Sequence, residues 1–198
     1  MFPLRHHCAL ALALATVFAP KLADAAGSVG AEVGLVKRYD APRSNPSLGY
    51  GLGIHADLDL IPALKVGGYY MLSSLSAQRV VGVTINTFGL RATFTAPIPG
   101  ALQPFVYAGA GYSWISYSYS GFIECARPDV PCAPPSGSGR FFELPLGGGA
   151  AYALSPLVRL VLDAAYRPGF GFEGKVFDGG DARPASGWSL MFGAVYQL

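Results

Sequence analysis

The segment Leu48-Gly-Tyr-Gly-Leu-Gly-Ile-His-Ala-Asp-Leu-Asp-Leu60 alternates two kinds of residue over its whole length. Even-numbered positions hold leucine, tyrosine, isoleucine or alanine, and odd-numbered positions hold glycine, histidine or aspartate. A period of two residues predicts a β-strand whose two faces meet different media. The segment is also longer than the mean strand of a soluble protein, which has about 5–6 residues.

Eight segments of this kind follow one another along the chain. Each is long enough to cross a bilayer at a tilt, which takes about 9–11 residues. A transmembrane β-barrel presents one face of every strand to lipid and the other to a polar lumen. We therefore predict an all-β fold, a closed antiparallel eight-stranded transmembrane up-and-down β-barrel. Its expected strands are Ser28–Tyr39, Leu48–Leu60, Leu64–Leu75, Val80–Ala96, Gln103–Ser120, Arg140–Leu154, Val158–Gly171 and Ser186–Leu198.

The connections between these strands differ in length at the two ends. Turns after the second, fourth and sixth strands are short and contain proline, whereas connections after the first, fifth and seventh are longer and polar. The connection after the third strand, 76–79, is short and departs from the pattern. Outer membrane barrels have short periplasmic turns and longer extracellular loops. The short turns are 61–63, 97–102 and 155–157, and the long loops are 40–47, 121–139 and 172–185.

The first 26 residues are typical of a secretory signal peptide. Arg5 precedes the apolar run Cys8–Phe18, and Ala23-Asp24-Ala25 offers a small-x-small cleavage pattern. The alternative, a transmembrane helix, needs about 20 apolar residues, which this run lacks. We expect 1–26 to be the signal peptide and 27–198 to be a single barrel domain.

Charged residues make up 13% of the chain, about half the usual share of about 25% in a soluble domain. The formal net charge of +2 gives no reason to expect a nucleic acid partner. Hydrophobic residues reach 52% without forming a helical span after the signal. That combination favours a barrel, because its lipid face uses only every second residue.

Two cysteines remain after the signal, Cys125 and Cys132, and both lie in the loop 121–139. In an exported chain, two cysteines in one loop predict a disulfide, and closing so short a loop contributes about 2–3 kcal/mol on the entropy model. Free thiols and half of a metal site are the alternatives, and no second cysteine pair or nearby histidine supports a metal. We expect this loop to be the main contact surface. Its candidate contact residues are Phe122, Arg127 and Asp129.

Charged residues of both signs fall on the predicted inner face of the barrel. Buried charges must be paired, or each costs several kcal/mol, so we expect a network of ion pairs that fills the lumen. A narrow path for water or ions is the alternative. The inward residues are Glu32, Arg38, His55, Asp57, Asp59, Lys65, Arg91, Glu143, Arg159, Asp163 and Arg167.

Two details of these faces need interpretation. Asp57 and Asp59 share a face with His55, so the two carboxylates could shift the pKa of the histidine or hold a cation. A metal site needs at least three converging ligands. The favoured interpretation is that these side chains are part of the polar packing of the lumen. In the fourth strand, Val81, Val83 and Ile85 are out of phase with the apolar face that follows, which predicts a bulge near Asn86.

Three segments of the chain resemble the OmpA-type family of eight-stranded outer membrane β-barrel proteins. They are Gln103–Tyr112, with a Pro-aromatic start and Gly-x-Gly; the glycine-rich Leu144–Leu154, which leads into a Ser-Pro turn; and Leu160–Arg167, which ends in Tyr-Arg. The resemblance implies location in the bacterial outer membrane, contact with its lipids, and recognition of the C-terminal strand by the insertion machinery. That strand closes on Leu198, where the family usually has an aromatic residue.

The expected function is a non-enzymatic one, in which the barrel displays loops to an extracellular ligand in an adhesion-like role. A narrow pore for small solutes or ions is the alternative. A lipid-modifying outer membrane enzyme is less favoured, because His55 is the one mature histidine and no Ser–His–acid arrangement surrounds it. A soluble lipocalin-like carrier would have to turn the polar face outward. We expect no cofactor, no metal and no catalytic residue.

Overall fold

The computed structural model describes residues 26–39, 48–77, 81–119, 137–175 and 186–198. These residues form ten β-strand segments, and every pairing between them is antiparallel. Within the described residues no helix is long and apolar enough to cross a membrane. The segments are β1 (Gly27–Arg38), β2 (Gly49–Ile61), β3 (Leu64–Ala77), β4 (Val81–Thr95), β5 (Leu102–Tyr119), β6 (Gly137–Glu143), β7 (Leu146–Ala153), β8 (Val158–Arg167), β9 (Gly169–Lys175) and β10 (Gly187–Gln197).

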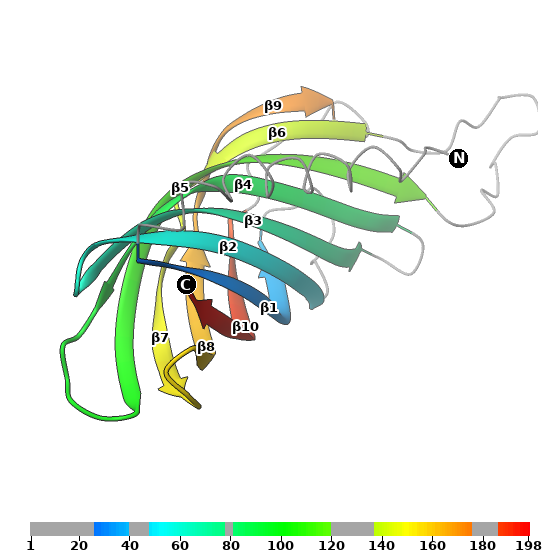
Figure 1. Cartoon of the computed structure of the whole chain (residues 1–198). Coiled ribbons are helices and arrows are strands. Elements are labelled where there is room, and N and C mark those ends of the chain that lie inside the picture. The colour runs from blue at the N-terminus through cyan, green and yellow to red at the C-terminus, as the bar shows by residue number, and fades with distance from the viewer. Residues whose placement is uncertain (1–25, 40–47, 78–80, 120–136, 176–185) are drawn as a thin grey trace, which may run out of the picture.

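The ten segments build a closed barrel of eight staves, where a stave is one run of chain from rim to rim. Figure 1 shows how the strands curve around the barrel. Six staves are single strands, β6 and β7 together make the sixth, and β8 and β9 make the seventh. Around the barrel the hydrogen-bonded order runs from β1 through β2, β3, β4, β5, β7, β8 and β10 back to β1. The predicted closed eight-stranded antiparallel barrel is confirmed.

Two staves are interrupted at the same level, where one continuous strand had been expected in each. The sixth stave breaks at Leu144 and Pro145, and the seventh breaks at Pro168. Proline has no N–H to donate to the sheet ladder. The carbonyl of Pro145 still accepts the N–H of Gly109 at 2.9 Å, and the carbonyl of Pro168 accepts the N–H of Leu144 at 3.1 Å. The two breaks are therefore neighbours in one line across the wall.

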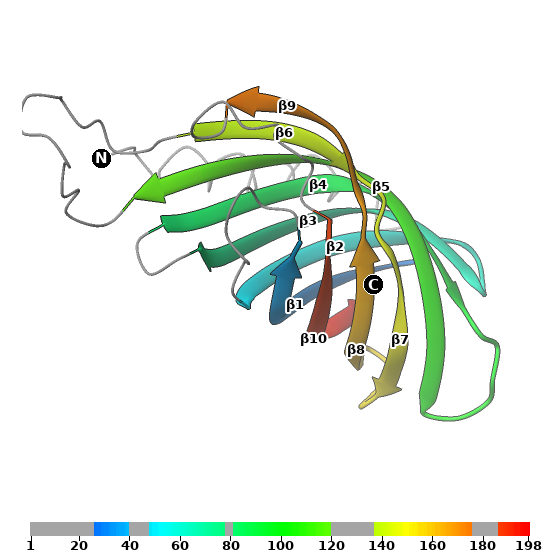
Figure 2. The ribbon, with the colours of Figure 1, turned by 180° about the vertical axis from the view of Figure 1, so that it is seen from behind.

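The two rims of the barrel differ. The three short turns lie at one rim, together with the start of β1 and the end of β10, which pair as Ser28 with Gln197. At the opposite rim β3, β4, β5, β6 and β9 run on beyond the last pair of β1 and β10, Arg38 with Gly187 (Figure 2). Following the rule for outer membrane barrels, the rim of short turns is periplasmic and the extended wall is the outer end.

The outward face of the strands is apolar over most of its length. Val33, Leu52, Leu90, Leu162 and Phe192 are each exposed, whereas their chain neighbours point into the barrel. In a membrane these exposed side chains meet hydrocarbon, which is the medium that the alternation of the sequence had indicated.

The bulge expected near Asn86 is absent, and the prediction is wrong. β4 keeps one register with β3 and with β5 through this position, so Val83 and Ile85 point inward while Phe88 and Leu90 point outward. The alternation of inward and outward side chains therefore continues unchanged along β4. What changes is the lumen itself, which is apolar at the outer end.

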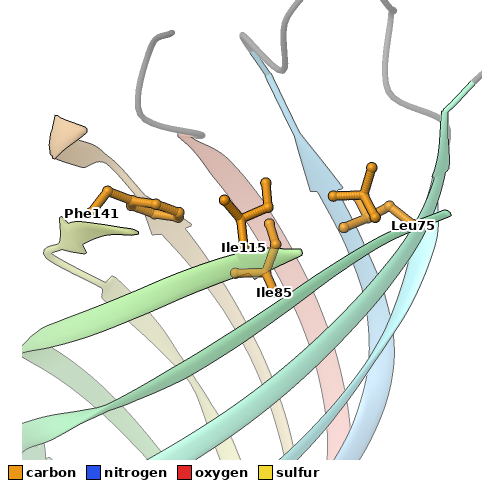
Figure 3. Packing of buried hydrophobic residues seen from close by; sticks show 5 residues of the cluster. Leu75, Ile85, Ile115 and Phe141 are labelled. Carbon is orange, nitrogen blue, oxygen red and sulfur yellow. The ribbon is translucent and has the colours of Figure 1, made fainter. Parts of the chain in front are cut away.

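This apolar part of the lumen is a cluster of five buried side chains on the outer parts of the long strands. Figure 3 shows Leu75 from β3, Ile85 from β4, Ile115 from β5 and Phe141 from β6 pointing into one space, and Val83 completes the cluster. Each is at most 3% exposed. The assumption that every inward position of a barrel is polar was therefore too simple.

The seam between β1 and β10 closes the sheet and leaves no room for a side chain at Gly34. A Cβ atom placed there would overlap the carbonyl oxygen of Leu190 and would lie 2.7 Å from the Cα of Met191. At Gly68, on the outward face of β3, the nearest atom would be 3.8 Å away.

We therefore expect Gly34→Ala to destabilise the barrel by about 1–3 kcal/mol, as overpacking of a filled site does, and Gly68→Ala to leave stability unchanged. The measurement is the temperature at which the purified protein loses its compact, fast-migrating form on gels. Equal effects from the two variants would show that the seam is not tightly packed.

Candidate functional site: the polar lumen

The structure places all eleven charged or titratable residues expected in the lumen on the inward face of their strands. β1 and β2 supply five of them, β3 and β4 one each, and the sixth and seventh staves the remaining four. Each is buried or half-buried. What the lumen can do depends on how these side chains are paired.

The centre of the network is a carboxylate held between two guanidinium groups. Arg38 Nη2 donates to Glu143 Oε2 at 3.0 Å, and Arg167 Nη1 donates to Glu143 Oε1 at 2.6 Å. The side chains of Arg38, Glu143 and Arg167 are 1%, 0% and 7% exposed. Arg167 also donates from Nε to Ser189 Oγ at 3.2 Å. Its guanidinium lies 5.8 Å from the ring centre of Tyr69.

A second group of paired side chains fills the lumen on the periplasmic side of the central three. Arg91 binds Asp57 through two hydrogen bonds, at 3.2 and 2.9 Å, which is the bidentate geometry that makes such pairs strong. The Arg91 guanidinium also lies 5.5 Å from the ring centre of Tyr107. The Tyr107 hydroxyl in turn donates to Asp163 Oδ1 at 3.1 Å.

His55, Asp57 and Asp59, which share a face in the sequence, do not form one cluster in the structure. His55 Nδ1 lies 3.3 Å from Glu32 Oε1, and His55 Nε2 lies 3.7 Å from Asp57 Oδ2. Asp59 Oδ1 instead lies 2.9 Å from Lys65 Nζ, without hydrogen-bond alignment. Across the described part of the chain, no three side chains of histidine, cysteine, aspartate or glutamate converge as metal ligands would.

The periplasmic mouth holds the looser end of the network. Lys65 Nζ donates to Ser28 Oγ at 3.3 Å and to Gln197 Oε1 at 3.2 Å. Arg159 Nη1 donates to Gln103 Oε1 at 2.6 Å. Lys65, Gln103, Arg159 and Gln197 border an open hollow of about 440 Å³.

A small hollow lies in the middle of the lumen. This hollow of about 20 Å³ lies between the ion pairs of Glu143 and the pair of Arg91 with Asp57. Its walls include Glu32, His55, Tyr69, Arg91 and Arg167. A volume of this size is about the room one water molecule needs. Together with the apolar cluster above it, these paired side chains occupy much of the lumen between its mouth and its outer end in the described part of the chain.

Several lumen residues were missing from the sequence-based prediction. Tyr69, Tyr107 and Ser189 point inward and bind the charged groups, although only charged residues and His55 had been named. The signal was present for Ser189, which lies in the inward phase of its strand. It was hidden for Tyr107, because aromatic residues occupy both faces of β5.

The expected loop residues cannot be placed in the same way. Cys125, Cys132, Phe122, Arg127 and Asp129 lie outside the described residues, as does the predicted signal peptide up to residue 25. The disulfide and the contact role of this loop therefore stay predictions.

A closed eight-stave barrel with an apolar outer surface, short turns at one rim and a charged, filled lumen defines an integral protein of the bacterial outer membrane. Residues 9–194 match the family described as "Outer membrane protein beta-barrel domain", and the chain belongs to this family. No curated protein sequence matches the chain.

Solved structures of outer membrane proteins share the fold. Neisserial surface protein A is 16% identical with a TM-score of 0.61, and the match covers 87% of this chain and 97% of that one. A major outer membrane protein from Thermus thermophilus is 19% identical with a TM-score of 0.58, covering 88% and 100%. The attachment invasion locus protein Ail of Yersinia pestis is 13% identical with a TM-score of 0.54, covering 88% and 99%. At these identities the likeness establishes the fold alone.

We expect Glu143→Gln to be strongly destabilising, because it leaves Arg38 and Arg167 buried without their carboxylate. Breaking a buried ion pair in this way costs about 3–5 kcal/mol. The matched control is Glu173→Gln, because Glu173 is 72% exposed and pairs with Arg140, which is 62% exposed; an exposed pair contributes about 0–1 kcal/mol. Denaturant unfolding in detergent micelles, followed by tryptophan fluorescence, measures both. Similar losses for the two variants would contradict the central role of Glu143.

Proposed function

We propose that this protein is a non-conducting, non-enzymatic outer membrane barrel that acts through the loops at its outer end, in an adhesion-like role. The observation that carries this proposal is the filled lumen. Its charged groups are bound to one another, its central hollow has room for about one water, and its outer part is apolar. A barrel with this interior offers solutes no wide path, so its outer end is the surface on which to look for function.

The extended wall supports the same proposal. β3, β4, β5, β6 and β9 continue outward beyond β1 and β10, and β5 alone is 18 residues long. A tilted strand needs only about 9–11 residues to cross the bilayer. The surplus carries the outer ends of β5 and β6, Tyr119 and Gly137, beyond the length that a bilayer needs.

The composition of the long connections indicates the class of partner. Segments 40–47, 120–136 and 176–185 contain five acidic residues and three arginines, and no lysine. Their net charge is −2, or −1 when Arg79 of the short outer connection 78–80 is included, and this balance does not favour a polyanion. Ail has been solved with the heparin analogue sucrose octasulfate, but the charge of these segments points instead to a protein surface that is neutral or basic. Prolines and the proposed Cys125–Cys132 disulfide would lower the entropy lost on binding.

We expect a non-adherent laboratory bacterium that expresses this protein to attach to cultured epithelial cells but not to heparin-coated wells. Replacing residues 121–136 by a short Gly-Ser linker should reduce attachment about tenfold or more, since a few residues dominate most interfaces. The Cys125→Ala/Cys132→Ala pair should give a smaller reduction, because it removes only the preorganisation of the loop.

The control for this experiment is the same replacement at 176–185, which should leave most of the attachment intact. All variants should keep the compact form on unheated gels, so that loss of folding is excluded. Attachment that survives replacement of 121–136, or an expressing strain that attaches no better than its vector control, would refute the proposal.

The second candidate function is a narrow pore, and the open hollow of about 440 Å³ at the periplasmic mouth is the observation in its favour. We expect no conductance steps from the purified barrel in a planar lipid bilayer, because the ion pairs of Arg38, Glu143 and Arg167 close the lumen above that hollow. A general porin in the same bilayer confirms that insertion is detected. Reproducible steps would replace the proposed function by the pore.

A further inference from the structure

The lipid-facing surface of the barrel carries few charges, and these lie toward its outer end. Among the side chains that the structure describes, only Lys37, Arg140 and Glu173 are charged and point outward. The neighbours of Lys37 on either side, Val36 and Arg38, are buried in the lumen. The periplasmic half of the described outer surface has no such charge.

From the length of β1 we infer that Lys37 lies near the outer lipid headgroups. It follows the first residue of β1, Gly27, by ten positions, and a tilted strand crosses the hydrocarbon core in about 9–11 residues. Lys37 pairs across the sheet with Trp188, and Trp188 pairs with Tyr166. Tryptophan and tyrosine concentrate at the boundary between lipid and water.

The side chains around Lys37 offer hydrogen-bond donors, and in the described part of the chain none of these donors has an acceptor. No carboxylate of the described chain pairs with Lys37, and its Nζ lies 5.8 Å from the ring centre of Tyr39. Tyr50 lies on the neighbouring strand, opposite Leu35. Within the described residues, no hydrogen bond is made by the side chains of Tyr39, Tyr50, Tyr166 and Trp188.

We propose that Lys37 and Trp188, with the surrounding tyrosines, bind the phosphate group of a lipid in the outer leaflet of the outer membrane. An ammonium group acts on phosphate as a point charge, and the indole and phenol groups add neutral donors to the phosphate oxygens. An anion rich in acceptors is the ligand that completes this set. The proposal rests on the membrane location alone and is independent of any role of the loops.

The other outward cation serves as a built-in comparison. Arg140 lies beside an aromatic cluster in which the rings of Tyr112 and Phe142 are 5.4 Å apart. Its Nε, however, already donates to Glu173 at 3.1 Å. Because Glu173 already accepts from its guanidinium, we expect Arg140 to contribute less to phosphate recognition than Lys37.

The experiment measures binding of lipid A, a glycolipid of the outer leaflet, to the purified full-length barrel in detergent micelles by native mass spectrometry. One sample of lipid A keeps both phosphates and the other has had them removed, so the acyl chains are the same. We expect the phosphorylated form to bind about fivefold more tightly, as about 1 kcal/mol per cation near a charged lipid surface implies. Lys37→Gln should abolish this difference.

Arg140→Gln is the matched control and should keep the preference for phosphorylated lipid A. Both glutamine variants leave the inward face untouched, so both should fold. Equal binding of the two lipids by the unmodified protein would overturn the proposal, as would equal effects of Lys37→Gln and Arg140→Gln. Inorganic phosphate that competes at the same concentration would show that a free ion, and not a lipid, is recognised.

Discussion

A sheet that spans a membrane must satisfy every backbone N–H and C=O within itself, because hydrocarbon offers no partner. In this chain the constraint is met by closing eight staves into a ring. Closure then divides the side chains strictly, since each residue faces either lipid or lumen. An eight-stranded barrel is just wide enough to be filled by its own side chains. The charged residues that lipid excludes are therefore pressed against one another, and the dense ion-pair network follows from the closed sheet.

The alternation of the sequence was sufficient to predict this arrangement. Apolar and polar residues alternate with a period of two in Leu48–Leu60 and in the later segments, which predicted the strands and their faces. The unequal lengths of the connections predicted the sidedness of the two rims. The alternation also placed all eleven residues of the predicted lumen set on the inward face. Periodicity is a strong signal in such a chain because a slip of one residue would move every side chain to the wrong medium.

Other features depend on contacts between distant segments, which periodicity does not encode. The inner face of β4 becomes apolar at Val83 and Ile85 because Leu75, Ile115 and Phe141 from three other strands meet them, and the pattern of β4 alone suggested a bulge instead. His55 pairs with Glu32, while Asp59 turns to Lys65. Which acid meets which base is decided by register and tilt, and neither was available from spacing along the chain.

Glu143 joins groups that lie far apart in the sequence, since its bond to Arg38 spans 105 positions. The two residues belong to staves that reach each other across the lumen only when the ring is complete. A contact that forms only when the ring closes is absent from a transition state in which the ring is still open, and such a contact acts mainly on the rate of unfolding. The central ion pairs thus have a kinetic consequence. They do little to speed folding of the barrel in the membrane, but they slow its unfolding once the sheet has closed.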